Sequence, residues 1–179
     1  MFLIKIYTTK VVGETMIILG IDPGLAIVGF GVLDKQKSKV DVVDYGVITT
    51  PKEDTLPQRL EKIYKGMCAL IDKYQPAQVA IEELFFNTNI TTGIAVAEAR
   101  GVIILACINK GVKLFEYTPL QIKQALTGNG RADKHQVQFM VKAILRLNSV
   151  PKPDDAADGL AAALCHSQTN LFLAGTDIK

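Results

Sequence analysis

The sequence predicts one α/β domain built on a mixed, five-stranded β-sheet with helices on both faces. The chain has 179 residues, which is enough for one domain with a sizeable core and short for two. Hydrophobic residues make up 49% and charged residues 21%, which is typical of a globular protein. The hydrophobic period changes repeatedly between that of strands and that of helices, and this alternation favours a sheet covered by helices.

Three strands begin the domain. Residues 17–22 form an apolar run that ends at Pro23 and Gly24, which indicates a buried strand followed by a sharp turn. The second strand covers residues 29–33, and the third covers residues 40–50 after a polar turn. Because these connections are short, we expect the three strands to be antiparallel neighbours.

A helix and a strand then alternate twice. Apolar residues recur at helical spacing over residues 56–74, and a short strand at residues 78–82 ends in paired acids. Residues 89–111 form a second helical stretch, rich in alanine and glycine, with Gly111 as its stop. Residues 112–117 return to the strand pattern.

The rest of the chain is predicted to be helical. A capping box at residues 118–121, with proline at the first helical position, begins a helix that a glycine-rich turn ends. A second capping box at residues 133–136 begins a helix that extends through Leu147. Two prolines then exclude helix, and the last helix covers residues 154–170.

Residues 16–170 are therefore expected to form a single domain. Residues 1–15 are an N-terminal extension without a signal-peptide pattern, and residues 171–179 are a C-terminal tail. No apolar run approaches the ~20 residues of a membrane helix. The three cysteines are widely spaced among apolar residues, which favours buried thiols in a reducing compartment. We expect a cytoplasmic protein without membrane association.

The basic residues are unevenly distributed, although the formal net charge is only +2. From residue 109 to residue 152, eight basic residues face two acidic ones, a formal charge of about +6. Such a segment either attracts polyanions or is a solvated face, and the second explanation is the commoner one.

Four carboxylates stand out because they lie in apolar surroundings: Asp22, Glu82, Asp155 and Asp158. Asp22 and Glu82 each end a predicted strand, and ligands of open α/β sheets gather at that edge. Asp155 and Asp158 share a helix face, among small residues that would let the helix approach the sheet. Taken singly, Asp22 is as easily a turn former as a functional group, and Asp155 suits the helix dipole.

The combination of these acids has a chemical meaning. Grouped carboxylates repel one another unless cations hold them. Oxygen ligands without cysteine or histidine favour Mg²⁺, with Mn²⁺ as an alternative. Two such ions ~3.5–4 Å apart would stabilise the attacking and leaving oxygens of phosphodiester hydrolysis. The four acids therefore predict a metal-dependent site for phosphodiester hydrolysis.

Several short motifs resemble those of one known family. The RuvC family of Holliday junction resolvases is similar at residues 21–24 (Ile-Asp-Pro-Gly), 80–82 (Ala-Ile-Glu) and 155–158 (Asp-Ala-Ala-Asp), with further matches at residues 99–102, 117–119, 121–124 and 134–138. The similarity extends from Met16 to about residue 170. Each motif alone is weak, whereas the set is specific.

This resemblance implies a ribonuclease-H-like fold and a homodimer that binds a four-way DNA junction. It implies that two strands are nicked symmetrically, leaving 5′-phosphate and 3′-hydroxyl ends, in homologous recombination and DNA repair. The branch-migration proteins RuvA and RuvB would be partners in a bacterial cytoplasm. Residues 1–15 have no counterpart in the family pattern.

The resemblance also assigns roles to individual residues. The catalytic, metal-binding acids of the family correspond to Asp22, Glu82, Asp155 and Asp158. Lys123 and Lys134 match basic positions that contact DNA near the scissile phosphate. Phe85 matches an aromatic residue that stacks on junction bases. Arg131 is a further candidate for a phosphate contact, with a solvated loop charge as the alternative.

Other positions stay open between a structural and a functional role. Asp154 is an alternative metal ligand, although the spacing to Asp158 favours Asp155. Arg100 is either a member of an ion pair or a DNA contact. The dimer interface is expected on the helix over residues 56–74 or, preferably, on the more apolar helix over residues 89–111. The second helix offers Ile94, Val96, Val102, Ile103 and Leu105.

Two other functional classes compete with a junction nuclease. Residues 20–24 also resemble the first phosphate loop of sugar-kinase and actin-like ATPases, but those proteins are longer and need a second glycine-rich motif, which this sequence lacks. A catalytically silent junction-binding module is disfavoured because bare carboxylates hinder polyanion binding. Among enzymes, a related nuclease that acts on RNA is the nearest rival.

Overall fold

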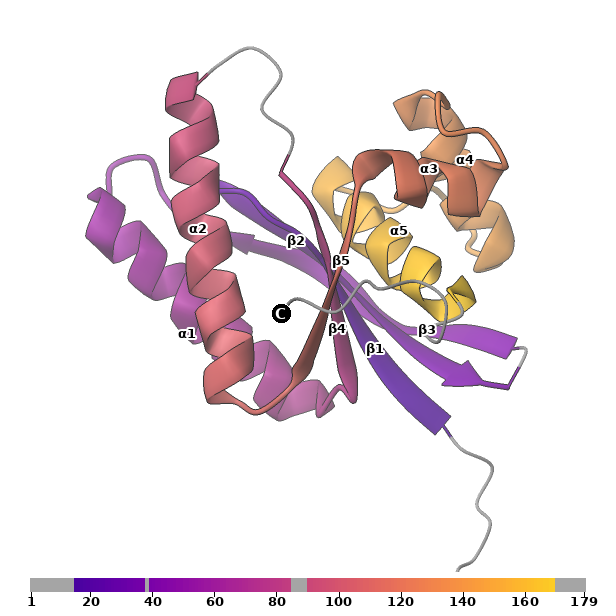
Figure 1. The fold of residues 1–179 in the computed structure, drawn as a ribbon, viewed down its shortest axis with the longest axis horizontal. Coiled ribbons are helices and arrows are strands. Elements are labelled where there is room, and N and C mark those ends of the chain that lie inside the picture. The colour runs from indigo at the N-terminus through magenta and orange to yellow at the C-terminus, as the bar shows by residue number, and fades with distance from the viewer. Residues whose placement is uncertain (1–14, 38, 85–89, 170–179) are drawn as a thin grey trace, which may run out of the picture.

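The computed structural model describes residues 15–37, 39–84 and 90–169, which form one mixed sheet flanked by helices (Figure 1). The strands are β1 (Thr15–Asp22), β2 (Ile27–Gln36), β3 (Lys39–Thr49), β4 (Gln78–Glu82) and β5 (Lys113–Tyr117). The helices are α1 (Leu56–Tyr74), α2 (Ile90–Asn109), α3 (Pro119–Thr127), α4 (Lys134–Ile144) and α5 (Asp154–Gln168). The predicted order of elements and the five-stranded mixed sheet are confirmed.

The sheet topology brings two distant strand ends together. The strand order is β3-β2-β1-β4-β5. β1, β2 and β3 are antiparallel, whereas β4 runs parallel to β1 and β5 runs parallel to β4. Ile21 of β1 lies beside Ile81 of β4. Asp22 and Glu82, the next residue of each strand, therefore lie at the same edge of the sheet.

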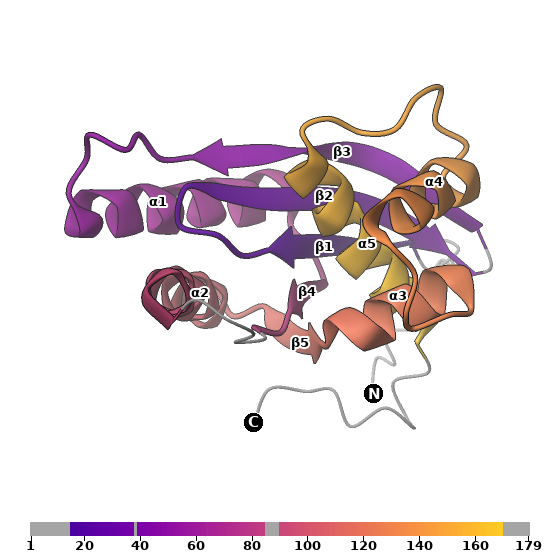
Figure 2. The same cartoon turned by 90° about the horizontal axis from the view of Figure 1, so that it is seen from above.

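Two hydrophobic cores cover the two faces of the sheet, because successive strand residues point to opposite sides. Ile18 and Leu33 pack with α3, α4 and α5. Leu19 and Val32 pack with α1 and α2. Figure 1 shows α1 and α2 on one side of the sheet and the other three helices on the opposite side. Seen from above, α5 lies across β1 and β2 (Figure 2).

Glycine lets α5 lie directly against the sheet backbone. A Cβ added at Gly31 would lie 2.6 Å from the Cα of Leu160, and one added at Gly159 would lie 2.7 Å from the backbone of Phe30. These separations are far below van der Waals contact, so a side chain at either position would push the helix away. The expectation that small residues let this helix approach the sheet is confirmed.

The elements differ from the predicted ones mainly at their ends. β1 begins at Thr15, and β2 extends beyond residues 29–33 in both directions. α4 ends at Ile144 rather than Leu147, because Arg146 adopts a left-handed backbone with φ of 54°. Gly111, with φ of 68°, follows α2 as the expected stop.

The remaining expectations about the whole chain concern membranes and thiols. None of the helices described by the structure is long and apolar enough to cross a bilayer. All three cysteines are free thiols, and two of them are buried. The prediction of buried thiols is therefore confirmed for Cys107 and Cys165, whereas Cys68 is only partly buried.

Candidate active site

Asp22 and Glu82 lie together at the carboxyl edge of the sheet. Each is the last residue of its strand, and the preceding Ile21 and Ile81 are fully buried. The carboxyl groups of Asp22 and Glu82 are close enough for each to affect the pKa of the other. The prediction that both acids end strands at one edge of the sheet is confirmed.

The turn that follows Asp22 is held from the end of β3. The backbone N–H of Thr50 donates to the carbonyl oxygen of Ala26 at 3.0 Å, and its hydroxyl donates to the carbonyl oxygen of Leu25 at 2.6 Å. Arg59 Nε donates to the Thr50 hydroxyl oxygen at 2.8 Å. No local sequence pattern points to Thr50 or Arg59, because the bond between this hydroxyl and a loop carbonyl joins distant parts of the chain.

α5 brings two more acids to this edge. Asp154 and Asp155 occupy its first turn, where carboxylates interact favourably with the helix dipole. Asp154 accepts a hydrogen bond from Lys152 Nζ at 2.7 Å, and this bond lowers the pKa of Asp154. The charges of Asp155 and Asp158 instead raise the pKa of Asp22. Asp155 and Asp158 therefore belong to the group around Asp22.

The negative charge of this group is not balanced by the protein. Burial, followed by the charges of Glu82, Asp158 and Asp155, raises the pKa of Asp22 from 3.8 to about 8. Burial and the charge of Asp158 raise the pKa of Glu82 from 4.5 to about 7. Burial also raises the pKa of Asp158. Asp22 and Glu82 therefore resist losing both protons near neutral pH unless a cation joins them.

Two lysines supply part of the missing positive charge. Lys134 Nζ, at the start of α4, is 3.2 Å from a carboxylate oxygen of Asp158 and 3.5 Å from one of Asp154. The charge of Lys123 on α3 partly opposes the rise in the pKa of Glu82 that burial and Asp158 cause. A cavity of about 290 Å³ is lined by Glu82, Lys123, Lys134 and Asp158 together with apolar residues of α3, α4 and α5. Both lysines therefore lie at the acidic site.

The donor set fits a hard divalent cation in its chemistry. All four acids offer oxygen ligands, and burial, followed by neighbouring carboxylates, raises the pKa values of Asp22 and Glu82. Within residues 15–37, 39–84 and 90–169, no three His, Cys, Asp or Glu side chains are placed so that they could hold one ion together. The fit of this site to a cation therefore lies in its ligand chemistry.

The other candidates for DNA contact have different outcomes. Phe85 lies outside the described residues. Arg131 is exposed in the loop before α4 and does not line the acidic cavity, so its role stays a prediction. Arg100, which was open between two roles, forms an ion pair with Glu116 of β5. Its side chain is only 18% exposed, so the structural role applies to this arginine.

The apolar residues of α2 separate into a buried and an exposed set. Ile103 is fully buried in the core shared with α1, so it is not available to a partner. Ile94 and Leu105 are 54% and 51% exposed, and Ile108 is 62% exposed. A helix that is apolar on nearly all sides gives no periodic signal, which is why the sequence did not distinguish the two sets.

Comparisons with known proteins agree on one family. The family described as crossover junction endodeoxyribonuclease RuvC matches residues 18–166. The curated RuvC of Finegoldia magna is 59% identical over 151 residues, which cover 84% of this chain and 92% of that protein. The RuvC of Rubrobacter xylanophilus is 54% identical over 162 residues, which cover 90% of each.

Solved structures give the same result. Thermus thermophilus RuvC superposes with a TM-score of 0.82 at 32% identity, covering 91% of this chain and 100% of that one. The same Thermus protein in complex with a Holliday junction substrate superposes with a TM-score of 0.85 at 32% identity, covering 91% and 99%. The chain thus belongs to the RuvC family of crossover junction endodeoxyribonucleases and has the ribonuclease-H-like fold of that family.

Proposed function

We propose that this protein is a structure-selective endonuclease that resolves Holliday junctions by metal-dependent phosphodiester hydrolysis, in homologous recombination and DNA repair. The observation that carries the proposal is the group of carboxylates from β1, β4 and α5 at one edge of the sheet, beside Lys123 and Lys134. The related Thermus protein binds a Holliday junction substrate, which supports the same substrate here.

The proposed metal ligands are Asp22, Glu82, Asp155 and Asp158, with Mg²⁺ or Mn²⁺ as the ions and two ions per site. When bound, such ions make water a nucleophile at neutral pH and stabilise charge on the attacking and leaving oxygens. Asp22 and Glu82 contribute buried carboxylates that cannot both ionise easily on their own. This arrangement creates the affinity for a cation.

Two lysines are proposed to hold the cleaved DNA strand. Lys123 and Lys134 line the same cavity as Glu82 and Asp158, so a phosphate at its mouth would meet positive charge on one side. Lys134 forms an ion pair with Asp158. We propose that it exchanges this partner for a phosphate oxygen when the strand binds. Phe85 is proposed to stack on junction bases, and Arg131 to contact a more distant phosphate.

Symmetric nicking of two strands requires two sites, and we propose a homodimer formed through α2. Ile94, Leu105 and Ile108 are exposed and lie at helical spacing on one face. Gly101 lies on the same face, and a Cβ there would meet no atom within 4 Å, so a second helix has room to approach. In this proposal residues 16–170 act as one nuclease domain that works with RuvA and RuvB, and the nicks leave 5′-phosphate and 3′-hydroxyl ends.

The direct test offers the purified protein a synthetic four-way junction, a linear duplex of the same sequence and an RNA–DNA hybrid. We expect cleavage of the junction with Mg²⁺ or Mn²⁺ and none with EDTA. Asp22→Asn should bind the junction and leave it uncut, whereas the matched Asp154→Asn variant should still cut it. Preferential cleavage of the hybrid would show that the substrate contains RNA and is not the junction. Cleavage by Asp22→Asn would show that Asp22 is not needed for catalysis.

A further inference from the structure

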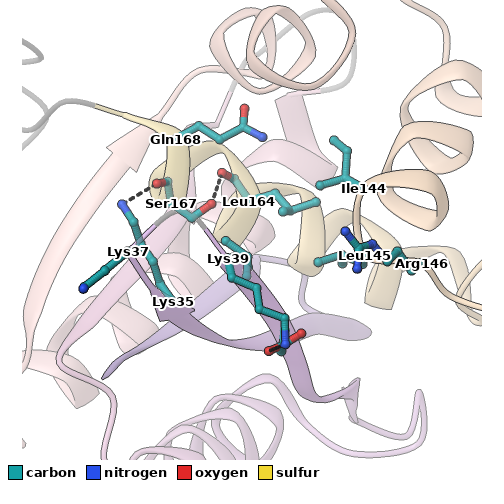
Figure 3. Close-up of a pocket in the computed structure, with 11 residues that line it drawn as sticks. Lys35, Lys37, Lys39, Ile144, Leu145, Arg146, Leu164, Ser167 and Gln168 are labelled. Carbon is teal, nitrogen blue, oxygen red and sulfur yellow. Dashed lines mark hydrogen bonds and ion pairs between the residues drawn. The ribbon is translucent and has the colours of Figure 1, made fainter. Parts of the chain in front are cut away.

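A second cavity lies at the opposite end of the sheet from the acids. It has a volume of about 480 Å³ and opens between the β2–β3 hairpin and the ends of α4 and α5 (Figure 3). In the β1–β2 register Lys35 pairs with Met16, six residues before Asp22 along β1. At ~3.4 Å per residue the hairpin end is therefore ~20 Å from Asp22. This hairpin-end cavity is distinct from the acidic site.

The lining of the hairpin-end cavity carries a surplus of positive charge. The charged residues that line it are Lys35, Lys37, Lys39, Arg146 and Asp41, a formal surplus of three positive charges. Lys35 is used within the fold, because its Nζ donates to the carbonyl oxygen of Ser167 near the end of α5. Lys39 forms an ion pair with Asp41 at 2.6 Å. Lys37 and Arg146 have no ion-pair partner among the described residues.

The two unpaired cations also occupy unusual backbone positions. Only three non-glycine residues in the described part of the chain have positive φ, and two of them are Lys37 at 52° and Arg146 at 54°. Glycine is the default residue for this conformation, and other residues adopt it at a cost of ~1 kcal/mol. The chain therefore places a long cation at two positions where local geometry favours glycine, and both cations line one cavity.

The cations are spread around the cavity. In Figure 3, Lys37 and Arg146 lie on opposite sides of it, one on the hairpin and the other after α4. A single small anion would need donors that converge, whereas a polymer with regularly spaced phosphates is bound by cations along a surface. α4 begins with Lys134 at the acidic site and ends just before Arg146, so both sites lie on the same side of the sheet.

We propose that the hairpin-end cavity binds backbone phosphates of duplex DNA through Lys37 and Arg146. On the proposed function, which this inference requires, the duplex is an arm of the junction, held ~20 Å from the cleaved phosphate. With a rise of 3.4 Å per base pair, that distance corresponds to ~6 base pairs of the arm. The contact would add affinity without reading sequence, because phosphates carry no base information.

The test uses the double variant Lys37→Gly/Arg146→Gly in the full chain. Glycine suits both left-handed positions, so the variant removes two cations without straining the fold, which a thermal melt checks. Affinity is measured as a function of salt for two four-way junctions, one with long arms and one whose arms are closed by hairpin loops within ~6 base pairs. For the long-armed junction, the slope of log K against log salt should become shallower by about 2. For the short-armed junction, wild type and variant should bind equally.

A charge-matched control and two other readouts make the result decisive. Lys65→Ala/Lys73→Ala removes two exposed lysines from α1, on the opposite side of the sheet, and should leave the long-armed slope unchanged. Metal-dependent cleavage of the short-armed junction by the wild type tests the proposed function separately. Equal salt slopes for the wild type and the glycine variant would overturn the arm contact. A second result would also overturn it. If calorimetry shows that the wild type binds inorganic phosphate and the variant does not, while both bind the junction equally well, the cavity is a small-anion site.

Discussion

The backbone of Asp155 lies directly on Gly29, the residue that pairs with Asp22 across β1 and β2. A Cβ at Gly29 would overlap the carbonyl oxygen of Asp155, so no other residue fits at this point of β2 without moving α5. The first turn of α5 is thereby held one strand away from Asp22. The position of Asp155 relative to Asp22 thus depends on Gly29, which has no side chain to separate α5 from β2.

Gly29→Ala should separate the acids without removing any of them. Because the added methyl group meets rigid backbone, α5 must shift, and we expect destabilisation of ~1–3 kcal/mol with a larger loss of cleavage than of junction binding. Urea unfolding and single-turnover cleavage measure the two effects. Gly46→Ala is the control, since its Cβ would meet only the end of the Phe30 ring, at 3.1 Å. If Gly29→Ala and Gly46→Ala cut equally well, the contact does not position Asp155.

The sequence was sufficient to predict that Asp22 and Glu82 share an edge of the sheet. Both residues end short apolar runs, and that pattern survives in the structure because each strand is buried on both faces. The pairing of β1 with β4 could not be read from the chain, since it depends on how α1 packs. The same holds for the ion pairs of Asp154, which bonds to Lys152 and also lies near Lys134.

Backbone geometry was the other feature that the sequence did not reveal. The sequence predicts that α4 ends at Leu147, but the helix ends at Ile144. The left-handed residue that follows it is Arg146, and no glycine marks this position in the sequence. The sequence also does not separate the buried Ile103 from exposed neighbours, because α2 is apolar on both its buried and its exposed faces. In both cases tertiary packing overrides a local pattern that is uniform or misleading.

Asp22→Asn should stabilise the metal-free protein, and more strongly at high pH. The folded state holds the Asp22 proton up to about pH 8, whereas the unfolded chain releases it near 3.8, so wild-type stability falls as pH rises between these values. Asparagine cannot ionise. In EDTA, the melting temperature of the variant should therefore exceed that of the wild type by an amount that grows towards pH 8.

Two further measurements, with Mg²⁺ and with a surface variant, separate relieved charge repulsion at Asp22 from a change in packing. Mg²⁺ should raise the melting temperature of the wild type more than that of Asp22→Asn, because a ligand that binds only the folded state stabilises it. Asp41→Asn, which removes a half-exposed carboxylate from the β2–β3 hairpin, is the surface control. A constant difference between Asp22→Asn and wild type at every pH would indicate a packing effect instead of relieved charge repulsion.

Leu105→Glu should convert the proposed dimer into a monomer while preserving the fold. Leu105 is already 51% exposed in the single chain, so its replacement leaves the core intact, but two glutamates facing each other across α2 would repel. Sedimentation velocity should show half the wild-type mass, with unchanged circular dichroism. Leu120→Glu is the matched control, because Leu120 is 62% exposed on α3, away from the proposed interface. An unchanged mass for Leu105→Glu would place the interface elsewhere.

His166 should limit stability on the acid side. This histidine is buried in α5 between the hydroxyl of Tyr117 and the side-chain oxygen of Gln78, at 2.7 Å from each. Burial, assisted by the charge of Lys35, lowers the pKa of His166 from 6.5 to about 4. Between pH 6.5 and about 4, His166 is therefore protonated in the unfolded chain and neutral in the folded state. The stability of the wild type falls as the pH decreases through this range.

His166→Gln should remove this acid dependence, because glutamine can bond to both partners without titrating. Its difference in unfolding free energy from the wild type should shift in favour of the variant as pH falls from 6.5 towards 4, by up to about 3 kcal/mol. Taking the difference between the two proteins cancels the opposite trend caused by Asp22. His135→Gln, at an exposed position of α4, is the control. Parallel pH profiles of His166→Gln and wild type would show that the buried imidazole does not govern acid unfolding.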